Sequence, residues 1–504
     1  MIPALAVFAV ATLLELSLWI PSFWRAQKVI AWVVAVGLLL SGALMILERS
    51  TFGSIMLLFI SAYRIVNMLR IVKGRMEKHY LRRVVTKTGL QLMAMQLVIA
   101  VSWWACQHYG ITLDSFWVIF SGLQLAGVLV VVLSTERHLR TTLPPKDVAN
   151  LAKQELPTLT VAIPARNETD DLEACLATLI ASDYPKLEIL VLDDCSQNAR
   201  TPEIIRGFAH AGVRFLQGEL PRDGWLAKNQ AYQQLLDEAN GELVLFAGVD
   251  SRYAPDSLRR LVAAMLAKNK TMMSIIPANT LQPMAAQSQS ILLQPSRYAW
   301  ELSLPRKMFN RPPVLSTCWL IRKNTLKSAG GFAAVSRSIV PESYFARVAG
   351  VHDGYSFMQS NEVIGITSAK AVPEQFDTSI RTRYPQLHRR PELVLILTLA
   401  EAFGFILPFV LLAAKLVLQP PMTSLVVSVV TCALILYFYG RIVSLTYRRF
   451  LLRGFLAAPF AALFDIVVLN YSMARYEFSE VIWKGRNVCI PVMRAIPSLP
   501  KIDG

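Results

Sequence analysis

The sequence predicts an α/β domain with a mostly parallel sheet, inserted between two bundles of membrane-spanning helices. Long apolar runs gather before residue 136 and after residue 391, and several reach the ~20 residues that cross a bilayer. Between these runs, short apolar strands alternate with amphipathic helices. That alternation is typical of βαβ units and of a parallel sheet.

Three short apolar segments, 159–163, 188–192 and 242–246, are the predicted strands. Polar residues follow them at 164–168, at 193–196 and around Asp250. The carboxyl ends of parallel strands share one edge of a sheet, and ligands of open α/β sheets bind at that edge. We therefore expect a binding site among these polar residues.

Two helices are predicted between the strands. The apolar residues that recur at helical spacing in 170–182 are Leu172, Cys175, Leu176 and Leu179. A second helix is expected to begin with Thr201 as its N-cap, because Pro202 and Glu203 suit a first helical turn.

Composition excludes several classes of protein. The chain of 504 residues is too long for one ordinary domain, and 54% of it is hydrophobic. Its net charge is 51 − 35 = +16, but the cations cluster beside the apolar runs, which indicates membrane-flanking charge and no nucleic-acid partner. The six cysteines show no C-x-x-C spacing, so we expect buried, reduced thiols without a disulfide framework or zinc site.

Candidate membrane spans define the expected domain organisation. Residues 1–135 hold five, at 2–20, 29–47, 52–70, 88–107 and 116–134, and residues 391–475 hold two to three, at 393–416, 424–439 and 454–469. A linker at 136–156 leads to the α/β domain at 157–390, and a basic, aromatic tail occupies 476–504. Arg64 and Asn67 interrupt the third segment, so a helix in the interface or packed against its neighbours is the alternative there.

Basic loops predict which side of the membrane the middle domain faces. Seven Lys and Arg stand between residues 70 and 87 against Glu77 alone, whereas 107–114 has none. The positive-inside rule then makes the segment 140–390 cytoplasmic. A strict count leaves the tail outside, but its patch WKGR at 483–486 is typical of a cytoplasmic surface. Asp465 and Pro459 also allow a re-entrant or surface helix before it.

Four motifs in this order resemble family-2 glycosyltransferases of the GT-A fold. They are the loop 164–168, the acidic corner 193–196, the segment GWLAK at 224–228, and Asp250. The resemblance covers residues 157–390 and extends to polytopic, lipid-directed members such as ceramide and hopanoid glucosyltransferases. It implies an inverting enzyme of the cell envelope, anchored in the cell membrane, that moves a sugar from a nucleotide-sugar donor, a UDP-sugar, onto a lipid or membrane-held acceptor.

The resemblance also implies a donor site. Its nucleotide-sugar binding residues are Pro164, Ala165, Arg166, Asn167, Glu168, Asp193, Asp194, Gly224 and Lys228. Glu168 and Asp194 would accept hydrogen bonds from the base or ribose, and Lys228 would face the phosphates. Alternatively, Asp193 and Asp194 cap a strand–loop corner, and Lys228 is solvated at a helix start.

Two acidic motifs of the family are altered here. Asp250 is all that remains of the D-x-D motif, because Gly248 replaces the first acid; it is the implied ligand of a divalent metal, Mg²⁺ or Mn²⁺. Arg252 is an alternative source of positive charge, and Asp250 alternatively caps the next helix. In the acceptor-side Glu-Asp motif Ser343 replaces Asp, so Glu342 is the candidate general base.

Further catalytic candidates precede the first C-terminal span. Gln386 and Arg389 match the family's Q-x-x-R-W element, with Arg390 in place of Trp, which implies contact with the donor diphosphate and the acceptor. The alternative is a basic flank of the membrane span. The stretch 283–312 is expected to form an amphipathic interface helix that admits a lipid acceptor, or a core helix.

Two other classes of function, a pseudoenzyme and a transporter, are alternatives to a glycosyltransferase. The altered acids leave open a pseudoenzyme, in which the fold is kept for nucleotide binding or assembly. A transporter is disfavoured, because intramembrane charges such as Glu15 and Arg64 are few and lie in no visible repeat.

Overall fold

The computed structural model describes residues 2–18, 26–47, 52–73, 87–99, 113–146, 148, 155–279, 290–303, 312–413, 419–447, 451–478 and 481–489. The chain forms two compact units. The first consists of Met1–Ala126, Gln386–Thr431 and Ile466–Phe478, and the second of Gly127–Pro385, Cys432–Asp465 and Ser479–Gly504.

The first unit is helical where it is described. It contains α1 (Ile2–Ser17), α2 (Gln27–Leu47), α3 (Phe52–Lys73), α16 (Pro391–Glu401), the π-helical turn η5 (Ala402–Ile406) and α17 (Leu407–Ala413). Three further helices are shared between the units, namely α5 (Leu113–Thr141), α19 (Met422–Thr446) and α20 (Leu451–Glu477).

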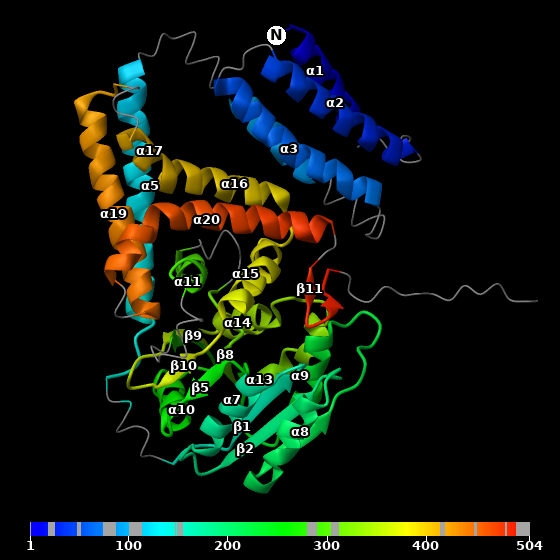
Figure 1. Cartoon of the computed structure of the whole chain (residues 1–504), viewed down its shortest axis with the longest axis vertical. Coiled ribbons are helices and arrows are strands. Elements are labelled where there is room, and N and C mark those ends of the chain that lie inside the picture. The colour runs from blue at the N-terminus through cyan, green and yellow to red at the C-terminus, as the bar shows by residue number, and fades with distance from the viewer. Residues whose placement is uncertain are drawn as a thin grey trace, which may run out of the picture. The chain divides into compact units, whose positions relative to one another are not determined.

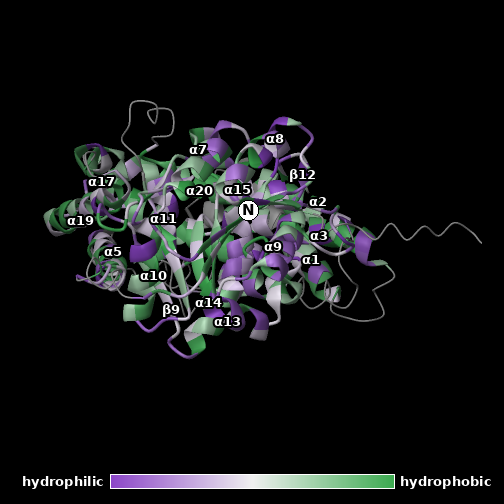
Figure 2. Ribbon diagram, turned by 90° about the horizontal axis from the view of Figure 1, so that it is seen from below, coloured by the Kyte–Doolittle hydropathy of each residue, from purple (hydrophilic) through white to green (hydrophobic). Residues whose placement is uncertain are grey.

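Five helical segments of the described residues are long and apolar enough to cross a membrane. They are Gln27–Leu44, Trp117–Thr141, Pro391–Ala413, Met422–Thr446 and Leu451–Glu477, and Figure 2 shows α17 and α19 largely in the green of hydrophobic residues. The predicted segment 88–107 is helical over 87–99, and its remainder lies outside the described residues. Helix α5 continues through residues 136–141, which the sequence assigns to the linker. Helix α20 is continuous through Pro459.

Arg64 and Asn67 in α3 are fully buried. Arg64 donates from Nε and Nη2 to Glu15 Oε2 at 2.9 and 2.7 Å, and from Nη1 to Gln96 Oε1 at 2.8 Å. Helix α3 packs against α2 and α16. The structure therefore favours the alternative reading of this segment, a helix packed against its neighbours.

The second unit contains a seven-stranded sheet in the order β3-β2-β1-β4-β8-β6-β9. Its strands are β1 (Leu159–Ala165), β2 (Leu187–Asp193), β3 (Val213–Gln217), β4 (Leu243–Ala247), β6 (Met272–Ile276), β8 (Cys318–Arg322) and β9 (Tyr355–Gln359). Neighbouring strands are parallel except where β8 pairs with β4 and β6. The prediction of a mostly parallel sheet is confirmed.

Side chains of the central strands alternate between two hydrophobic cores. Leu243 and Leu245 of β4 belong to one core, and Val244 and Phe246 belong to the other, as the two-residue period of a strand requires. Helices cover both faces (Figure 1). They are α7 (Asp170–Ile180), α8 (Arg200–Gly207), α9 (Ala227–Glu238), α10 (Ser257–Ala267), α13 (Lys323–Ser328) and α14 (Pro341–Val351), with 3₁₀ turns η2 (Ala209–Ala211) and η4 (Gly331–Val335). Helix α15 (Val372–Gln386) follows β10 in the chain. Strands buried on both faces read as continuous apolar runs.

The predicted strands and the first predicted helix are confirmed. Helix α7 buries the four apolar residues that its sequence pattern identified. The predicted start of α8 is wrong, because the helix begins at Arg200 with Ala199 as its N-cap. Thr201 instead donates its hydroxyl to the carbonyl of Glu168 at 2.8 Å and to Asn198 Oδ1 at 2.7 Å, so it ties α8 to the loop after β1.

Helix α11 (Leu293–Ser303) is buried on nearly every side, which favours a core helix over an interface helix for the described part of 283–312. Two small sheets complete the unit: β5 (Ser251–Tyr253), β10 (Ile366–Ser368) and β7 (Ala278–Asn279), and a hairpin of β11 (Ile482–Trp483) and β12 (Arg486–Asn487). The cysteines in the described part of the chain are free thiols, buried except for half-buried Cys195.

Candidate active site

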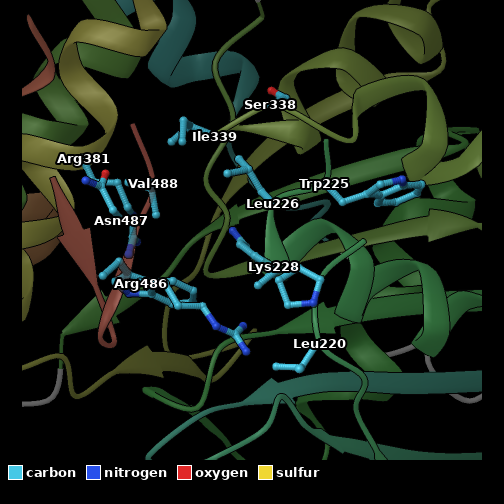
Figure 3. A pocket seen from close by; sticks show the side chains of 13 residues that line it. Leu220, Trp225, Leu226, Lys228, Ser338, Ile339, Arg381, Arg486, Asn487 and Val488 are labelled. Carbon is cyan, nitrogen blue, oxygen red and sulfur yellow. The ribbon is translucent and has the colours of Figure 1, made fainter. Parts of the chain in front are cut away.

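Two cavities lie at the edge of the sheet where β1 and β4 end. The polar cavity, of about 280 Å³, is lined by the charged side chains of Glu168, Lys228, Asp250, Lys370, Glu374, Asp377, Arg381 and Lys484. The apolar cavity, of about 310 Å³, shares Lys228, Arg381 and Trp483 with it and is otherwise lined mainly by apolar residues (Figure 3). The sequence predicted a binding site at this edge of the sheet.

The loop after β1 and the corner after β2 hold each other in place. Asn167, at φ 51°, donates its N–H to Ser196 Oγ at 2.9 Å, and its Oδ1 accepts from the N–H of Gln197 at 2.7 Å. Asparagine tolerates this left-handed conformation. Arg166 donates from Nη1 to the carbonyl of Asp194 at 2.6 Å. Arg166 and Asn167 therefore shape the edge through contacts with the protein itself.

Asp193 and Asp194 play different parts in this corner. Asp193 Oδ1 accepts from the N–H of Ser196 at 3.1 Å, which is the capping role that the alternative reading gave it. The N–H of Asp194 donates to the carbonyl of Ala165 at 2.8 Å, while Pro164 lines the polar cavity.

Glu168 and Asp194 are both paired with cations of the β11–β12 hairpin. Lys484 Nζ lies 3.1 Å from Glu168 Oε2, and Arg486 Nη1 lies 2.7 Å from Asp194 Oδ2. Burial raises the pKa of both carboxyls, and the neighbouring cations oppose that rise. Of the two acids assigned to the nucleoside, Asp194 is buried and Glu168 is half-buried, and each pairs with a side chain of this chain.

Lys228 lies in the first turn of α9 and lines both cavities. Burial lowers its pKa to about 8; Glu342 opposes this shift, and the nearby cations Arg381 and Lys370 add to it. Its Nζ is 5.1 Å from the ring centroid of Tyr232. The ammonium thus faces a cavity and other charges, which disfavours the reading of a solvated helix start.

The GWLAK segment that precedes α9 is fixed against the loop at 335–338. Gly224 has φ 80°, a left-handed conformation that favours glycine. Asn229 donates from Nδ2 to the carbonyls of Val335 and Ser338, at 2.8 Å each. These contacts hold the start of α9, and with it Lys228, at the cavities.

Asp250 is buried, and its carboxylate reaches β10 and the residues after it. Oδ2 accepts from Ser368 Oγ at 3.4 Å and lies 3.7 Å from Lys370 Nζ. Helix α10 has Asp256 at its N-cap position, so the alternative reading of Asp250 as that cap is wrong. Within the described residues, no group of three or more His, Cys, Asp or Glu is arranged to hold a metal ion. The described residues therefore offer a divalent metal one carboxylate ligand, Asp250, and oxygens of a bound ligand would have to complete the coordination.

Gly248 and Arg252 flank this carboxylate in sequence. A Cβ at Gly248 would lie 2.5 Å from Asp250 Oδ1, so glycine leaves room for the present position of that carboxylate. Arg252 donates from Nη2 to Asp171 Oδ1 at 2.6 Å. The cation paired with Asp250 is therefore Lys370, which disfavours the alternative that assigned this charge to Arg252.

Glu342 lies in the first turn of α14 and is buried. Its Oε2 has no hydrogen-bond partner in the described structure, and its charge acts on both Lys228 and Arg297. Ser343 is half-buried beside it. An unsatisfied buried carboxylate oxygen is costly, and the role of Glu342 as general base stays a prediction.

The remaining catalytic candidates belong to the first compact unit. Gln386 is buried at the end of α15. Arg389 lies over the ring of Tyr476 at 5.1 Å, and Arg390 donates from Nε to Glu392 Oε1 at 2.6 Å. Their contact with a donor or an acceptor stays a prediction.

Several charged residues of the cavities were not predicted as site residues. Lys370 and Arg381 belong to segments without a recognised motif, and nothing in their spacing indicates a site. Trp483, Lys484 and Arg486 form the WKGR patch, whose basic and aromatic composition was the available signal. That patch was interpreted as a surface feature, because chain order alone does not reveal that it returns to the sheet edge.

Comparisons with known proteins identify the class of this domain. Residues 160–329 match the family model described as glycosyl transferase family 2. The chain therefore carries a family 2 glycosyltransferase domain over these residues, and the predicted family and GT-A fold of this domain are confirmed. The lipid-directed subtype stays a prediction.

Relatives of known sequence match short stretches. The chain is 26% identical over 111 residues to the succinoglycan biosynthesis protein ExoO of Rhizobium meliloti, which is 22% of this chain and 30% of ExoO. It is 31% identical over 105 residues to an uncharacterized protein of Mycobacterium tuberculosis, covering 21% of this chain and 31% of that protein. The matched stretches thus span about 30% of the curated relatives.

Two solved structures are similar at low identity. The mannosyltransferase PcManGT of Pyrobaculum calidifontis, in complex with GDP-Man and Mn²⁺, is 17% identical with a TM-score of 0.43, over 71% of this chain and 99% of that chain. The glucosyl-3-phosphoglycerate synthase of Mycobacterium tuberculosis, in complex with Mn²⁺, UDP and phosphoglyceric acid, is 18% identical with a TM-score of 0.31. The likeness covers 49% of this chain and 84% of that chain.

Proposed function

We propose that this protein is a membrane glycosyltransferase that moves a sugar from a UDP-sugar to a lipid or another membrane-held acceptor, with inversion. The observation that carries the proposal is the polar cavity, where Glu168, Lys228 and Asp250 come together from three motifs of a family 2 glycosyltransferase domain. Five apolar helical segments, which precede and follow that domain in the sequence, support a membrane-held acceptor.

The donor would lie along the sheet edge. Glu168 and Asp194 accept hydrogen bonds from N–H and O–H groups of the base and ribose. Lys228, at the start of α9, faces the diphosphate, because a cation and a helix N-terminus both favour negative charge. Asp193, Arg166 and their neighbours position these residues.

A divalent metal, Mg²⁺ or Mn²⁺, fits this site as a shared ion, held by Asp250 together with oxygens of the donor diphosphate. When bound, it would neutralise charge on the leaving diphosphate. Lys370 lies 3.7 Å from Asp250 Oδ2, so a permanent positive charge already stands next to that carboxylate. The protein itself therefore supplies part of the neutralisation.

Glu342 is the proposed general base. It takes the proton of the acceptor hydroxyl while the hydroxyl oxygen attacks the anomeric carbon, and the bond between that carbon and the diphosphate oxygen breaks. The electron pair leaves with the nucleoside diphosphate, and a single displacement inverts the anomeric centre. Gln386, Arg389 and Arg390 are proposed to contact the diphosphate and the acceptor.

The catalytic domain, with proposed boundaries at residues 157 and 390, is proposed to be cytoplasmic. The excess of Lys and Arg in the loop 70–87 supports this orientation. Nucleotide sugars are then available to the domain on the same side of the cell membrane.

Product analysis tests the proposal. Detergent-solubilised protein is incubated with a panel of nucleotide sugars and native lipid, and a lipid-linked product of inverted anomeric configuration is expected with a UDP-sugar. Asp250→Asn and Glu342→Gln serve as inactive controls. If the wild type and both variants release nucleoside diphosphate at one indistinguishable background rate with every donor, the pseudoenzyme reading replaces this one.

A further inference from the structure

The β11–β12 hairpin brings the end of the described chain onto the proposed donor site. Lys484 Nζ lies 3.1 Å from Glu168 Oε2 and 3.7 Å from Glu374 Oε1, and Arg486 Nη1 lies 2.7 Å from Asp194 Oδ2. Two of these acids, Glu168 and Asp194, are the carboxylates that we assign to the nucleoside. The hairpin cations therefore stand where a bound nucleoside would place its hydrogen-bond donors.

Further contacts hold the hairpin in this position. Arg166 donates from Nε to the carbonyl of Lys484 at 2.9 Å. The ring of Trp483 lies 4.7 Å from the guanidinium carbon of Arg381, a cation–π distance. Trp483 lines both cavities, and Figure 3 shows Arg486 at the apolar cavity together with Lys228 of α9.

The turn of the hairpin contains Lys484 at a position whose backbone conformation lysine rarely adopts. Lys484 and Gly485 have φ values of 46° and 77°, which is the pattern of a two-residue type I′ turn. Asparagine or glycine is the usual first residue of such a turn, and lysine rarely adopts φ > 0. The turn conformation therefore does not account for a lysine at position 484, whereas the ion pairs of its side chain do.

We propose that this hairpin is a mobile part of the donor site whose cations change partners: Lys484 and Arg486 occupy Glu168 and Asp194 before the donor binds, and contact the donor diphosphate once the nucleoside takes those carboxylates. This inference rests on the proposed function.

The exchange keeps every buried charge satisfied. A buried carboxylate that loses its partner is strongly destabilised, but the N–H and O–H donors of a nucleoside replace the lost hydrogen bonds. The released guanidinium and ammonium groups find phosphate oxygens, with which arginine forms paired, charge-assisted hydrogen bonds. A nucleoside without phosphates breaks the same ion pairs and offers the two cations no new partner.

The exchange predicts opposite effects of the hairpin cations on two ligands. Lys484→Asn removes the ammonium and supplies the residue that a type I′ turn prefers, so the hairpin is expected to remain folded. Arg486→Gln removes the guanidinium and keeps a hydrogen-bond donor. In both variants the affinity for UDP should fall about tenfold, as expected for one charge-assisted hydrogen bond, while the affinity for uridine should rise.

Calorimetry on the full chain in detergent measures these affinities for uridine and UDP, and for guanosine and GDP in parallel. The matched control is Arg214→Gln, an exposed arginine of β3 that pairs with Glu188 and Glu238. It is expected to leave the UDP-to-uridine affinity ratio unchanged. In Lys484→Asn and Arg486→Gln that ratio should fall at least tenfold.

Two results would overturn the exchange while leaving the proposed function in place. The first is an unchanged UDP-to-uridine affinity ratio in both hairpin variants; if both ligands weaken equally, the hairpin is a structural support. The second is tighter binding of both ligands, which would mean that the hairpin only blocks the site. A wild-type protein that binds neither UDP nor GDP would instead refute the proposed function, and the exchange with it.

Discussion

Two ion pairs in this molecule share their chemistry and differ in their surroundings. In the helical unit, the side chains of Arg64 and Glu15 are 0% and 2% exposed and meet at 2.7 Å. In the α/β unit, the side chains of Arg486 and Asp194 are 19% and 6% exposed and also meet at 2.7 Å. Arg486 lines a cavity of about 310 Å³, whereas Arg64 is enclosed and donates a further hydrogen bond to Gln96.

The difference separates a structural pair from an exchangeable one. An enclosed pair has no replacement partner within reach, so loss of either member leaves a buried charge unpaired. A pair at a cavity can be opened by a ligand that brings its own donors and acceptors. Distance alone, which is the same in both pairs, does not distinguish these roles.

A third kind of buried acid gives the largest predicted effect. Glu342 has an oxygen, Oε2, without a hydrogen-bond partner in the described structure, and its charge acts on Lys228 and Arg297. Glu342→Gln should lower kcat for sugar transfer by about 10²–10⁴-fold, because only proton removal is lost, and should leave UDP affinity unchanged. Steady-state transfer and calorimetry measure the two quantities, with Ser343→Ala as the neighbouring control. Transfer at the wild-type rate by the Gln variant would exclude Glu342 as the base.

Removal of the enclosed cation should affect stability and not binding. Arg64→Ala is expected to lower the free energy of unfolding by about 3–5 kcal/mol, since it leaves Glu15 buried and unpaired. Arg214→Ala, at an exposed pair, should cost at most about 1 kcal/mol. Thermal unfolding in detergent compares the two variants, and UDP affinity of the folded Arg64→Ala protein should equal that of the wild type. If both variants lose an equal and small amount of unfolding free energy, the distinction between enclosed and exposed ion pairs is contradicted.

The smallest predicted effect is a pH dependence of donor binding. Burial lowers the pKa of Lys228 to about 8, so its ammonium is present below pH 8 and lost above it. If the ammonium contacts the diphosphate, UDP affinity is constant below pH 8 and falls by up to about tenfold between pH 8 and pH 9. Lys228→Arg should abolish this fall, because a guanidinium stays charged. A pH-independent affinity in the wild type would exclude the contact.

The parts of the fold that local sequence determines were predicted correctly. Strands β1, β2 and β4 are buried on both faces, so their apolar runs are conspicuous, and α7 shows its buried face as a helical repeat. The motif residues Glu168, Lys228 and Asp250 were predicted individually, and they line one cavity. Their convergence follows from the parallel sheet, which brings the ends of distant strands to one edge.

The residues that were missed reach the site through tertiary structure. Arg486 of the WKGR patch contacts Asp194, which is 292 positions away in sequence. No local sequence pattern reveals that contact. Lys370 follows a three-residue strand in a small sheet, too short to give a periodic signal. The N-cap of α8 was misplaced because the Thr201 hydroxyl has a partner in another loop, which local capping rules do not consider.

The central claim is that the acids at the sheet edge hold the nucleoside, and Asp194→Asn tests it most directly. The variant keeps the size of the side chain and removes its charge, so the site should remain folded. Calorimetry on the full chain in detergent should show the affinities for uridine and UDP falling together by about 10–100-fold, as expected for a hydrogen bond to a charged group. This pattern differs from that of the hairpin variants, in which the two ligands respond in opposite directions. Unchanged affinity of Asp194→Asn for UDP, with wild-type binding established in the same experiment, would contradict the claim.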